Sequence, residues 1–237
     1  MSAYPKSPAA SRRTLLGWTM RGAAALALSS LALPLRPAPA RAAAPLPAAQ
    51  LTEQDLQDVH RIEAYLTGIK SLKARFQQFS QNGGLIYGNI YLRRPGRLRI
   101  EYDPPVPVLL VANGQNIFYY DKELQQVSEL RVDETPAGFL LRDQITLSGD
   151  VTLTRFEHRP GAIRLTIVET TQPGQGSATL VLDDKPLQLK QWTIVDPQQK
   201  EVTLALTDPH YGAPVDEKLF YWTDPRPTGS NGRGSTR

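Results

Sequence analysis

Residues 88–105 read GNIYLRRPGRLRIEYDPP, two alternating strands that meet at a Pro95-Gly96 turn. Successive side chains of a strand point to opposite faces, so Arg94 ends a row of apolar side chains on one face of the first strand. After the turn, Leu98, Ile100 and Tyr102 alternate with charged residues, which is typical of one dry face and one wet face. The pattern predicts an apolar concavity with one guanidinium at its rim. A solvated strand end, with Arg94 in water, fits the same alternation.

Residues 1–42 have the composition of a secretory signal peptide. Basic residues precede an apolar run from Gly22 to Leu35, and Ala40-Arg41-Ala42 offers the small-x-small pattern at which signal peptidase cuts, so we expect cleavage near Ala42. A retained membrane anchor is the competing interpretation, but a run of 14 residues is too short to span the hydrocarbon of a bilayer. The segment SRRTLL at 11–16 resembles the twin-arginine export signal, and the general secretory and twin-arginine routes both stay open.

The same 42 residues hold six of the 27 basic residues and no acidic residue, which leaves 21 basic and 23 acidic residues and a net charge of −2. A general basic field for binding nucleic acid is therefore not expected of the exported part. The chain has no cysteine, so its stability cannot depend on disulfides and must come from its core.

The exported part is expected to form one domain over residues 52–223, between an Ala/Pro-rich linker at 43–51 and a disordered polar tail at 224–237. Thr52 is suited to cap a helix, and acidic residues follow in its first turn. Gly68 marks the end of that helix. Its apolar stripe, with spacings of three or four residues, is Leu56, Val59, Ile62, Leu66 and Ile69.

From residue 72 onward the hydrophobic period becomes two, and turn signals recur roughly every 8 to 12 residues. This pattern is typical of an antiparallel sandwich or barrel built as a meander of hairpins. The predicted strands are 72–81, 85–94, 97–103, 107–112, 115–121, 124–130, 150–158, 162–170, 177–183, 187–196, 200–207 and 217–222.

The segment 135–142 interrupts the strand pattern. Thr135 is suited to cap a helix, Pro136 suits its first position, and Phe139, Leu140 and Leu141 follow consecutively. We predict a short helix packed over the sheet, either as an ordinary crossover plug or as a lid over a pocket.

The sequence carries no signal for catalysis. His60, His158 and His210 are scattered over a helix, a strand end and a loop, and none has metal-ligand spacing. The carboxylate pair Asp183-Asp184 lies in a turn, where a solvated turn is the simpler interpretation than acid/base chemistry. We therefore expect a binding protein without a cofactor. An exported lipid hydrolase would need a nucleophile beside one of the histidines.

The strand that contains residues 117–120, IFYY, has large apolar or aromatic side chains on both faces. Neither face is suited to water, so both need cover. A helix outside and a ligand or lid inside would provide it.

Over residues 52–223 the chain resembles the LolA family of periplasmic outer-membrane lipoprotein carriers. The similarity depends on three motifs taken together, since each alone is weak. They are SLKARFQQ at 71–78, Gly88-x-x-x-Leu92-x-Arg94-Pro95 followed by LRIEY at 98–102, and Leu110-Val111-x-Asn113-Gly114 leading into FYYD at 118–121.

The resemblance implies a mainly β fold, an unclosed antiparallel barrel of about eleven strands, with the N-terminal helix and short lid helices over an apolar cavity. The family's functional arginine, which immediately precedes a proline, corresponds to Arg94; in the family it is thought to hold the lid shut through hydrogen bonds to lid backbone. The candidate lid is the segment 135–142. The implied lipid- and lid-binding side chains are Arg94, Ile86, Ile90, Leu92, Leu98, Ile100, Tyr102, Leu110, Phe118, Tyr120, Phe139, Leu140 and Leu141.

The implied function is that of a monomeric periplasmic carrier. It would accept lipid-modified proteins from an inner-membrane ABC-type release complex and deliver them to an outer-membrane acceptor. The sister receptor of the same fold is itself a lipoprotein and requires a cysteine after its signal, so the absence of cysteine favours the carrier. The alternative is a lipid- or lipoprotein-sensing regulatory module of the same fold, which binds its ligand without delivering it.

Overall fold

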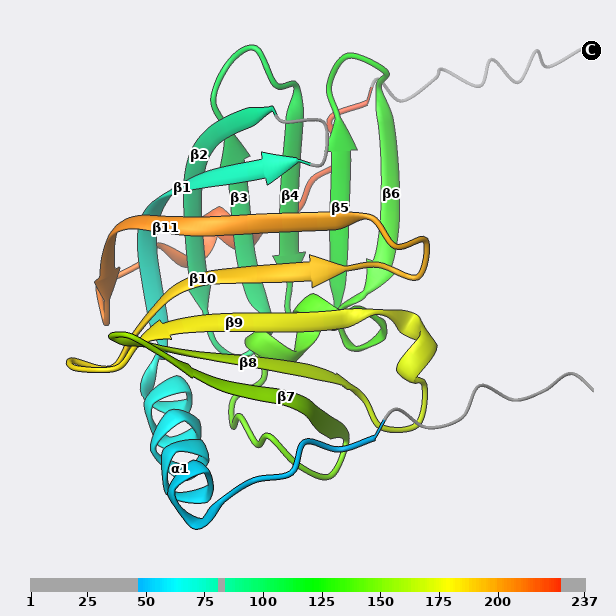
Figure 1. Cartoon of the computed structure of the whole chain (residues 1–237). Helices are drawn as coiled ribbons and strands as arrows, with labels where there is room; N and C mark the ends of the chain where they lie inside the picture. The colour runs from blue at the N-terminus through cyan, green and yellow to red at the C-terminus, as the bar shows by residue number, and fades with distance from the viewer. Residues whose placement is uncertain (1–46, 81–83, 227–237) are drawn as a thin grey trace, which may run out of the picture. The chain divides into compact units, whose positions relative to one another are not determined.

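The computed structural model describes residues 47–80 and 84–226 (Figure 1). Within them, eleven antiparallel strands form one sheet in the order β6-β5-β4-β3-β2-β1-β11-β10-β9-β8-β7. The strands are β1 (Ser71–Ser80), β2 (Leu85–Arg93), β3 (Arg97–Tyr102), β4 (Val108–Asn113), β5 (Asn116–Asp121), β6 (Gln126–Arg131), β7 (Val151–Arg159), β8 (Ala162–Glu169), β9 (Ser177–Asp183), β10 (Gln188–Val195) and β11 (Glu201–Tyr211).

The sheet curls so that its two halves face each other, and its two edge strands do not pair. In Figure 1, β10 and β11 run across the front of β3 to β6, and β7, β8 and β9 lie below these strands. The halves are joined through β1, where Leu72 pairs with Leu92 of β2 on one side and with Tyr211 of β11 on the other. Strands β6 and β7 are the two edges of the sheet, so the barrel is unclosed, as the family resemblance implied.

The connection from β6 to β7 has to cross from one edge of the sheet to the other. It contains two short 3-10 helices, η1 (Val132–Glu134) and η2 (Pro136–Leu141). The prediction of a capped helix over 135–142 is confirmed, because the Thr135 side chain accepts a hydrogen bond from the Gly138 N–H at 3.1 Å. A Cβ on Gly138 would lie 1.9 Å from the Val132 carbonyl oxygen, so glycine is required for η1 and η2 to approach this closely.

The predicted N-terminal helix is α1 (Glu53–Gly68), with Thr52 and Asp55 forming a reciprocal capping box. Val59, Ile62 and Leu66 on its apolar stripe are buried in the core. Leu56 belongs to the same predicted stripe but is 40% exposed. No helix in the described part of the chain is both long and apolar enough to span a bilayer.

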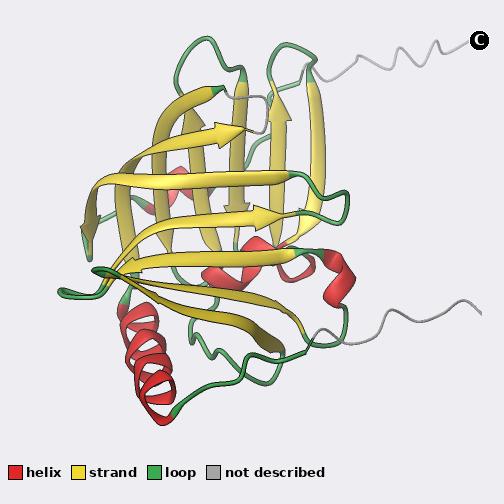
Figure 2. Cartoon of the chain, in the orientation of Figure 1, coloured by secondary structure: helices red, strands yellow, loops and turns green. Residues whose placement is uncertain are grey.

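The predicted strand at 217–222 is wrong. Residues Glu217–Phe220 form a 3-10 helix, η4, whose first turn is capped by the Asp216 side chain. This segment lies against the outer face of the sheet at β3 and β4 and buries Phe220, and Figure 2 shows its helical turn behind these strands. Another 3-10 turn, η3 (Pro173–Gln175), separates β8 from β9.

The ends of the predicted domain fall partly outside the described residues. The signal peptide at 1–42 and most of the tail at 224–237 lie outside them. Of the predicted linker, residues 47–51 are described, and the Ala49 N–H donates to the Leu153 carbonyl of β7 at 2.8 Å.

An ionic contact holds α1 against the turn between β9 and β10. Arg61 Nη2 lies 2.5 Å from Asp184 Oδ1 and 2.8 Å from Asp58 Oδ1. The hydrogen bond from Arg61 keeps the pKa of Asp184 below its ordinary value. A carboxyl group with a lower pKa in the folded protein stabilises the fold above its unfolded-state pKa of about 4, and that contribution is lost as the pH falls through the folded-state value.

We therefore expect Asp184→Asn to lower the free energy of unfolding at pH 7, with the difference from wild type shrinking as the pH falls from about 4 towards 2. Urea unfolding across this pH range measures both quantities. Asp150→Asn is the control, because its side chain is 85% exposed and it lies 3.6 Å from Arg142; its effect should stay within about 0.5 kcal/mol. A constant difference between Asp184→Asn and wild type from pH 7 to pH 2 would contradict the expectation.

Candidate functional site

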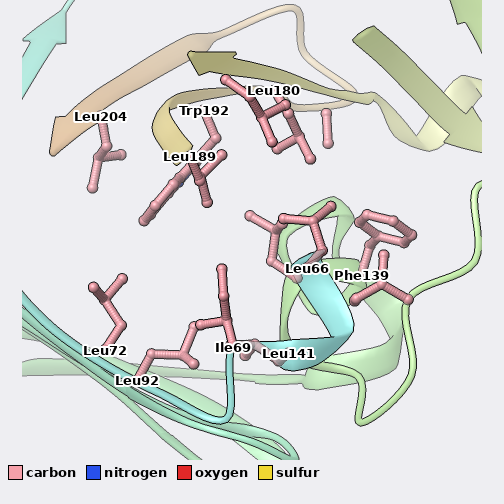
Figure 3. Packing of buried hydrophobic residues seen from close by; sticks show 14 of the residues in the cluster. Leu66, Ile69, Leu72, Leu92, Phe139, Leu141, Leu180, Leu189, Trp192 and Leu204 are labelled. Carbon is pink, nitrogen blue, oxygen red and sulfur yellow. The ribbon is translucent and has the colours of Figure 1, made fainter. Parts of the chain in front are cut away.

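An apolar cavity of about 440 Å³ lies between the two halves of the sheet. Figure 3 shows Leu72 and Leu92 facing Leu204, Leu189 and Trp192 across an open space, with Leu66, Phe139 and Leu141 gathered beside it. The residues that line the cavity are Ile69, Leu72, Gln78, Ile86, Leu92, Arg94, Leu98, Ile100, Tyr102, Val106, Val108, Leu110, Ile117, Tyr119, Leu140, Leu141, Leu189, Trp192, Ile194, Val202 and Leu204.

Arg94 lies at the end of the cavity that η2 covers, and it is only 7% exposed. Its Nε donates to the Leu140 carbonyl of η2 at 2.8 Å, and its Nη1 donates to the Leu66 carbonyl of α1. One guanidinium therefore connects η2 to the C-terminal end of α1. The solvated position that the alternation also allowed for Arg94 is not the one found.

The charge of this guanidinium is satisfied by carbonyl groups, and no carboxylate within the described ranges forms an ion pair with it. Burial lowers the pKa of Arg94 to about 10, while Asp143, which pairs with Lys70, opposes that shift. Arg94 consequently remains charged at neutral pH. A buried charge of this kind is costly unless its donors find acceptors, so its position depends on η2 and α1.

A second contact from the same hairpin holds η2. The Gly96 N–H donates to the Leu141 carbonyl at 2.7 Å, next to the carbonyl that Arg94 binds. Carbonyl groups in the last turn of a helix have no partner within the helix. Two of these carbonyls in η2 are thus satisfied by residues on either side of Pro95.

Nine of the thirteen predicted side chains line the cavity. They come from β2 and the turn that follows it, from β3 and β4, and from η2, and they are Arg94, Ile86, Leu92, Leu98, Ile100, Tyr102, Leu110, Leu140 and Leu141.

Ile90 and Phe139 were predicted with these nine but lie elsewhere. Ile90 is fully buried in the core between β1 and β3, opposite Ala74 and Ile100. Phe139 lies on the other side of η2 from the cavity, where it lines a smaller cleft against β7, β8 and β9. The Arg142 guanidinium lies 5.8 Å from the centre of its ring.

Phe118 and Tyr120 face away from the cavity, which corrects their predicted place. The Phe118 ring stacks on Trp222 with 4.9 Å between ring centres, and Tyr120 meets the edge of the same indole at 6.1 Å. Their neighbours Ile117 and Tyr119 line the cavity instead. Both faces of β5 are covered, and its outer face packs against Trp222, in the segment that follows η4.

Strands β10 and β11 supply five lining residues that the sequence did not single out: Leu189, Trp192, Ile194, Val202 and Leu204. Alternation along 192–194 and 202–204 could have placed four of them on one face. Leu189 lies three residues before Trp192 and reaches the same face through the register shift between Leu189 and Gln191. Only the pairing of β1 with β11 brings that face opposite the β2–β3 hairpin.

Gln78 and Tyr102 form a polar pair in this apolar lining. The Tyr102 hydroxyl donates to Gln78 Oε1 at 2.6 Å, and burial raises the pKa of Tyr102 to about 12, so the phenol keeps its proton. Fully buried Phe76 meets the Tyr102 ring edge-on, with 5.4 Å between ring centres. Gly88 leaves space for this contact, because a Cβ there would lie 2.6 Å from the Phe76 ring.

The family model described as "Outer membrane lipoprotein carrier protein LolA" matches residues 67–223, more than half of the chain. The chain belongs to the LolA family. The span that matches LolA includes all 21 residues that line the cavity, together with η2. Most of α1 precedes it.

Curated relatives carry the same family description. The outer-membrane lipoprotein carrier protein of Azotobacter vinelandii is 32% identical over 141 residues, 56% of this chain and 61% of that protein. The protein of that description from Cupriavidus pinatubonensis is 34% identical over 92 residues, 34% of this chain and 43% of that protein. The chain thus spans about half the length of the curated relatives that it matches.

Among solved structures, a LolA superfamily protein from Nitrosomonas europaea aligns with a TM-score of 0.40 at 10% identity. The alignment covers 69% of this chain and 97% of that one.

Proposed function

We propose that the protein is a periplasmic carrier that shelters the acyl chains of lipoproteins between the inner and the outer membrane. It would accept its cargo from an inner-membrane ABC-type release complex and deliver it to an outer-membrane acceptor. The observation that carries this proposal is the apolar cavity, closed at one end by η2, which Arg94 holds through backbone carbonyls. The signal-like residues 1–42 and the names of the relatives support the compartment and the cargo.

The cavity has the right chemistry for an acyl chain. Its lining is almost entirely aliphatic and aromatic, and each buried CH₂ group contributes about 0.8 kcal/mol, so one sheltered chain gains on the order of 10 kcal/mol. A methylene group takes up about as much space as a water molecule, whose share of the liquid is about 30 Å³. A volume of about 440 Å³ therefore holds at least about fifteen methylene groups, which is enough for one acyl chain.

Additional chains require η2 to move away from the cavity. In this proposal the segment 135–142 is a lid, and the hydrogen bonds from Arg94 and Gly96 hold it shut in the empty protein. Loading breaks these bonds, which offsets part of the hydrophobic gain. The cargo is bound less tightly than burial alone would give and can be handed on.

Mass spectrometry of the full chain purified from the periplasm of a Gram-negative host tests the proposal. We expect acylated polypeptides to co-purify with it. Leu110→Lys, which places a charge in the cavity, should abolish this, whereas Leu124→Lys, at a position 65% exposed in the β5–β6 turn, should not. If only free lipids co-purify, the result favours a lipid-sensing module over a carrier. If no lipid of any kind co-purifies, both functions are contradicted.

A further inference from the structure

Arg94, beside η2, and the pair of Gln78 and Tyr102 lie far apart in the cavity. The other polar groups in the lining are the indole of Trp192 and Tyr119, whose partner Leu110 lies opposite Ile100, between these two places. The strand register separates Arg94 from Gln78. Leu72 of β1 pairs with Leu92, two residues before Arg94, whereas Gln78 lies six residues further along β1 and pairs with Ile86.

Gln78 pairs with Ile86, which lies eight residues before Arg94, so at about 3.3 Å per strand residue the two positions are about 26 Å apart along the strand. The hydrocarbon core of a bilayer is about 30 Å thick and holds two chains end to end, so one acyl chain extends about 15 Å. A single chain therefore fits lengthwise between Arg94 and Gln78, and its polar linkage reaches one end.

Arg94 is partly engaged while η2 is in place, because its Nε and Nη1 donate to the carbonyls of Leu140 and Leu66. The guanidinium is also charged, so it suits an anionic partner better than a neutral carbonyl. The Gln78 end offers a neutral donor, because only one half of its amide is engaged. Oε1 accepts the Tyr102 hydroxyl at 2.6 Å, and no group in the described ranges accepts a hydrogen bond from Nε2.

The pair is also fixed in position before any ligand binds. The Phe76 ring holds Tyr102 edge-on at an interplanar angle of 90°, and the Tyr102 hydroxyl in turn fixes the Gln78 amide. Gly88, which pairs with both Phe76 and Tyr102, leaves room for the two rings. A donor that is held in this way loses little freedom when it binds a ligand.

The unengaged N–H of Gln78 determines which kind of acyl linkage can bind at this end of the cavity. An ester or amide carbonyl only accepts hydrogen bonds, and an amide N–H supplies the required donor. A carboxylate or a phosphate would seek a cation. The lining at this end has none, since Arg94 lies at the other end and Arg75 faces outward to pair with Asp103.

We propose that Gln78, held by Tyr102, binds the neutral ester or amide carbonyl through which an acyl chain is attached, so that the chain enters tail-first towards η2. This inference rests on the proposed carrier function and names the part of the cargo that this end of the cavity recognises. Gln78 is then a specificity-determining residue for acylated polypeptides over fatty acid anions.

Two probes separate recognition of the carbonyl from simple hydrophobic capture. One is a synthetic peptide with a single fatty acyl chain attached to a serine through an ester, which carries one ester carbonyl and needs no second place in the cavity. The other is diphenylhexatriene, a hydrocarbon without any polar group. We expect Gln78→Leu to weaken binding of the peptide about fivefold to tenfold, as for one lost hydrogen bond, and to leave diphenylhexatriene binding unchanged. Gln77→Leu, on the outer face of the same strand, should change neither.

Tyr102→Phe keeps the ring against Phe76 and removes only the hydroxyl that fixes Gln78. We expect Tyr102→Phe to weaken binding of the peptide, but less than Gln78→Leu does, and to leave diphenylhexatriene binding unchanged. Equal losses for both probes, or an undiminished peptide affinity in Gln78→Leu, would overturn the inference. Wild-type protein that binds diphenylhexatriene but not the peptide would instead overturn the proposed carrier function.

Discussion

Arg94→Leu is expected to accumulate loaded carrier and to slow handover of a labelled lipopeptide to acceptor membranes about tenfold or more. Leucine cannot donate to the Leu140 and Leu66 carbonyls, so the empty, closed protein loses the contacts that favour it. Hydrogen bonds from a charged donor are worth about 1.5 to 3 kcal/mol each, and the desolvation of the guanidinium offsets part of this. A net shift of about 1.4 kcal/mol is already tenfold in the equilibrium between empty and loaded protein.

The matched control is Arg97→Leu on the next strand of the same hairpin. The Arg97 side chain lies on the outer face, where it forms an ion pair with Glu217 at 3.1 Å, and it makes no contact with η2. Its removal should leave handover within twofold of wild type, as expected for a surface ion pair worth about 0 to 1 kcal/mol. Unchanged handover in Arg94→Leu would refute the role of Arg94 in holding η2 closed.

The second large effect is expected for Gly88→Ala, a single added methyl group in β2. The new Cβ would lie 2.2 Å from the Glu101 carbonyl oxygen of β3 and 2.6 Å from the Phe76 ring. Backbone and a fully buried ring cannot both yield, so we expect a loss of about 3 kcal/mol in the free energy of unfolding. For a domain of this size that corresponds to a fall in Tm of roughly 10 °C.

Gly68→Ala adds the same methyl group at the last residue of α1, where a Cβ meets nothing within 4 Å. This variant should be neutral or more stable by up to about 1 kcal/mol, because alanine favours the helical conformation. Thermal unfolding of the two variants beside wild type makes the comparison. Equal Tm values for the two would show that the Gly88 position tolerates a side chain.

Local patterns in the sequence predicted most of the fold. The capping residues of α1, the hairpin around Pro95-Gly96 and the Thr135 cap of η2 each depend on neighbours within a few residues, and the structure has all three. The predicted strand at 217–222 was wrong because its apolar residues serve a different contact. Phe220 and Trp222 cover the outer face of β3 to β5 without adding a strand to the sheet.

The candidate site was harder to predict because it combines segments far apart in the sequence. Hairpin alternation placed Leu98 and Ile100 on the cavity face, since their outward neighbours are charged. Alternation could not place Phe118 and Tyr120, because both faces of their strand are apolar, and these two were included only through the family resemblance. The face was decided by Trp222, about a hundred residues further along the chain.

Because the outer edges of β6 and β7 are unpaired, the curled sheet has an open seam between them. In a closed barrel the number of strands and the shear fix the diameter. A wider interior would therefore require additional strands or broken hydrogen bonds between strands. A sheet with a seam can uncurl instead, and every bond between neighbouring strands survives. In the proposed carrier, this seam would let the cavity widen around a larger group of acyl chains once η2 has moved away, at the cost of bending the sheet.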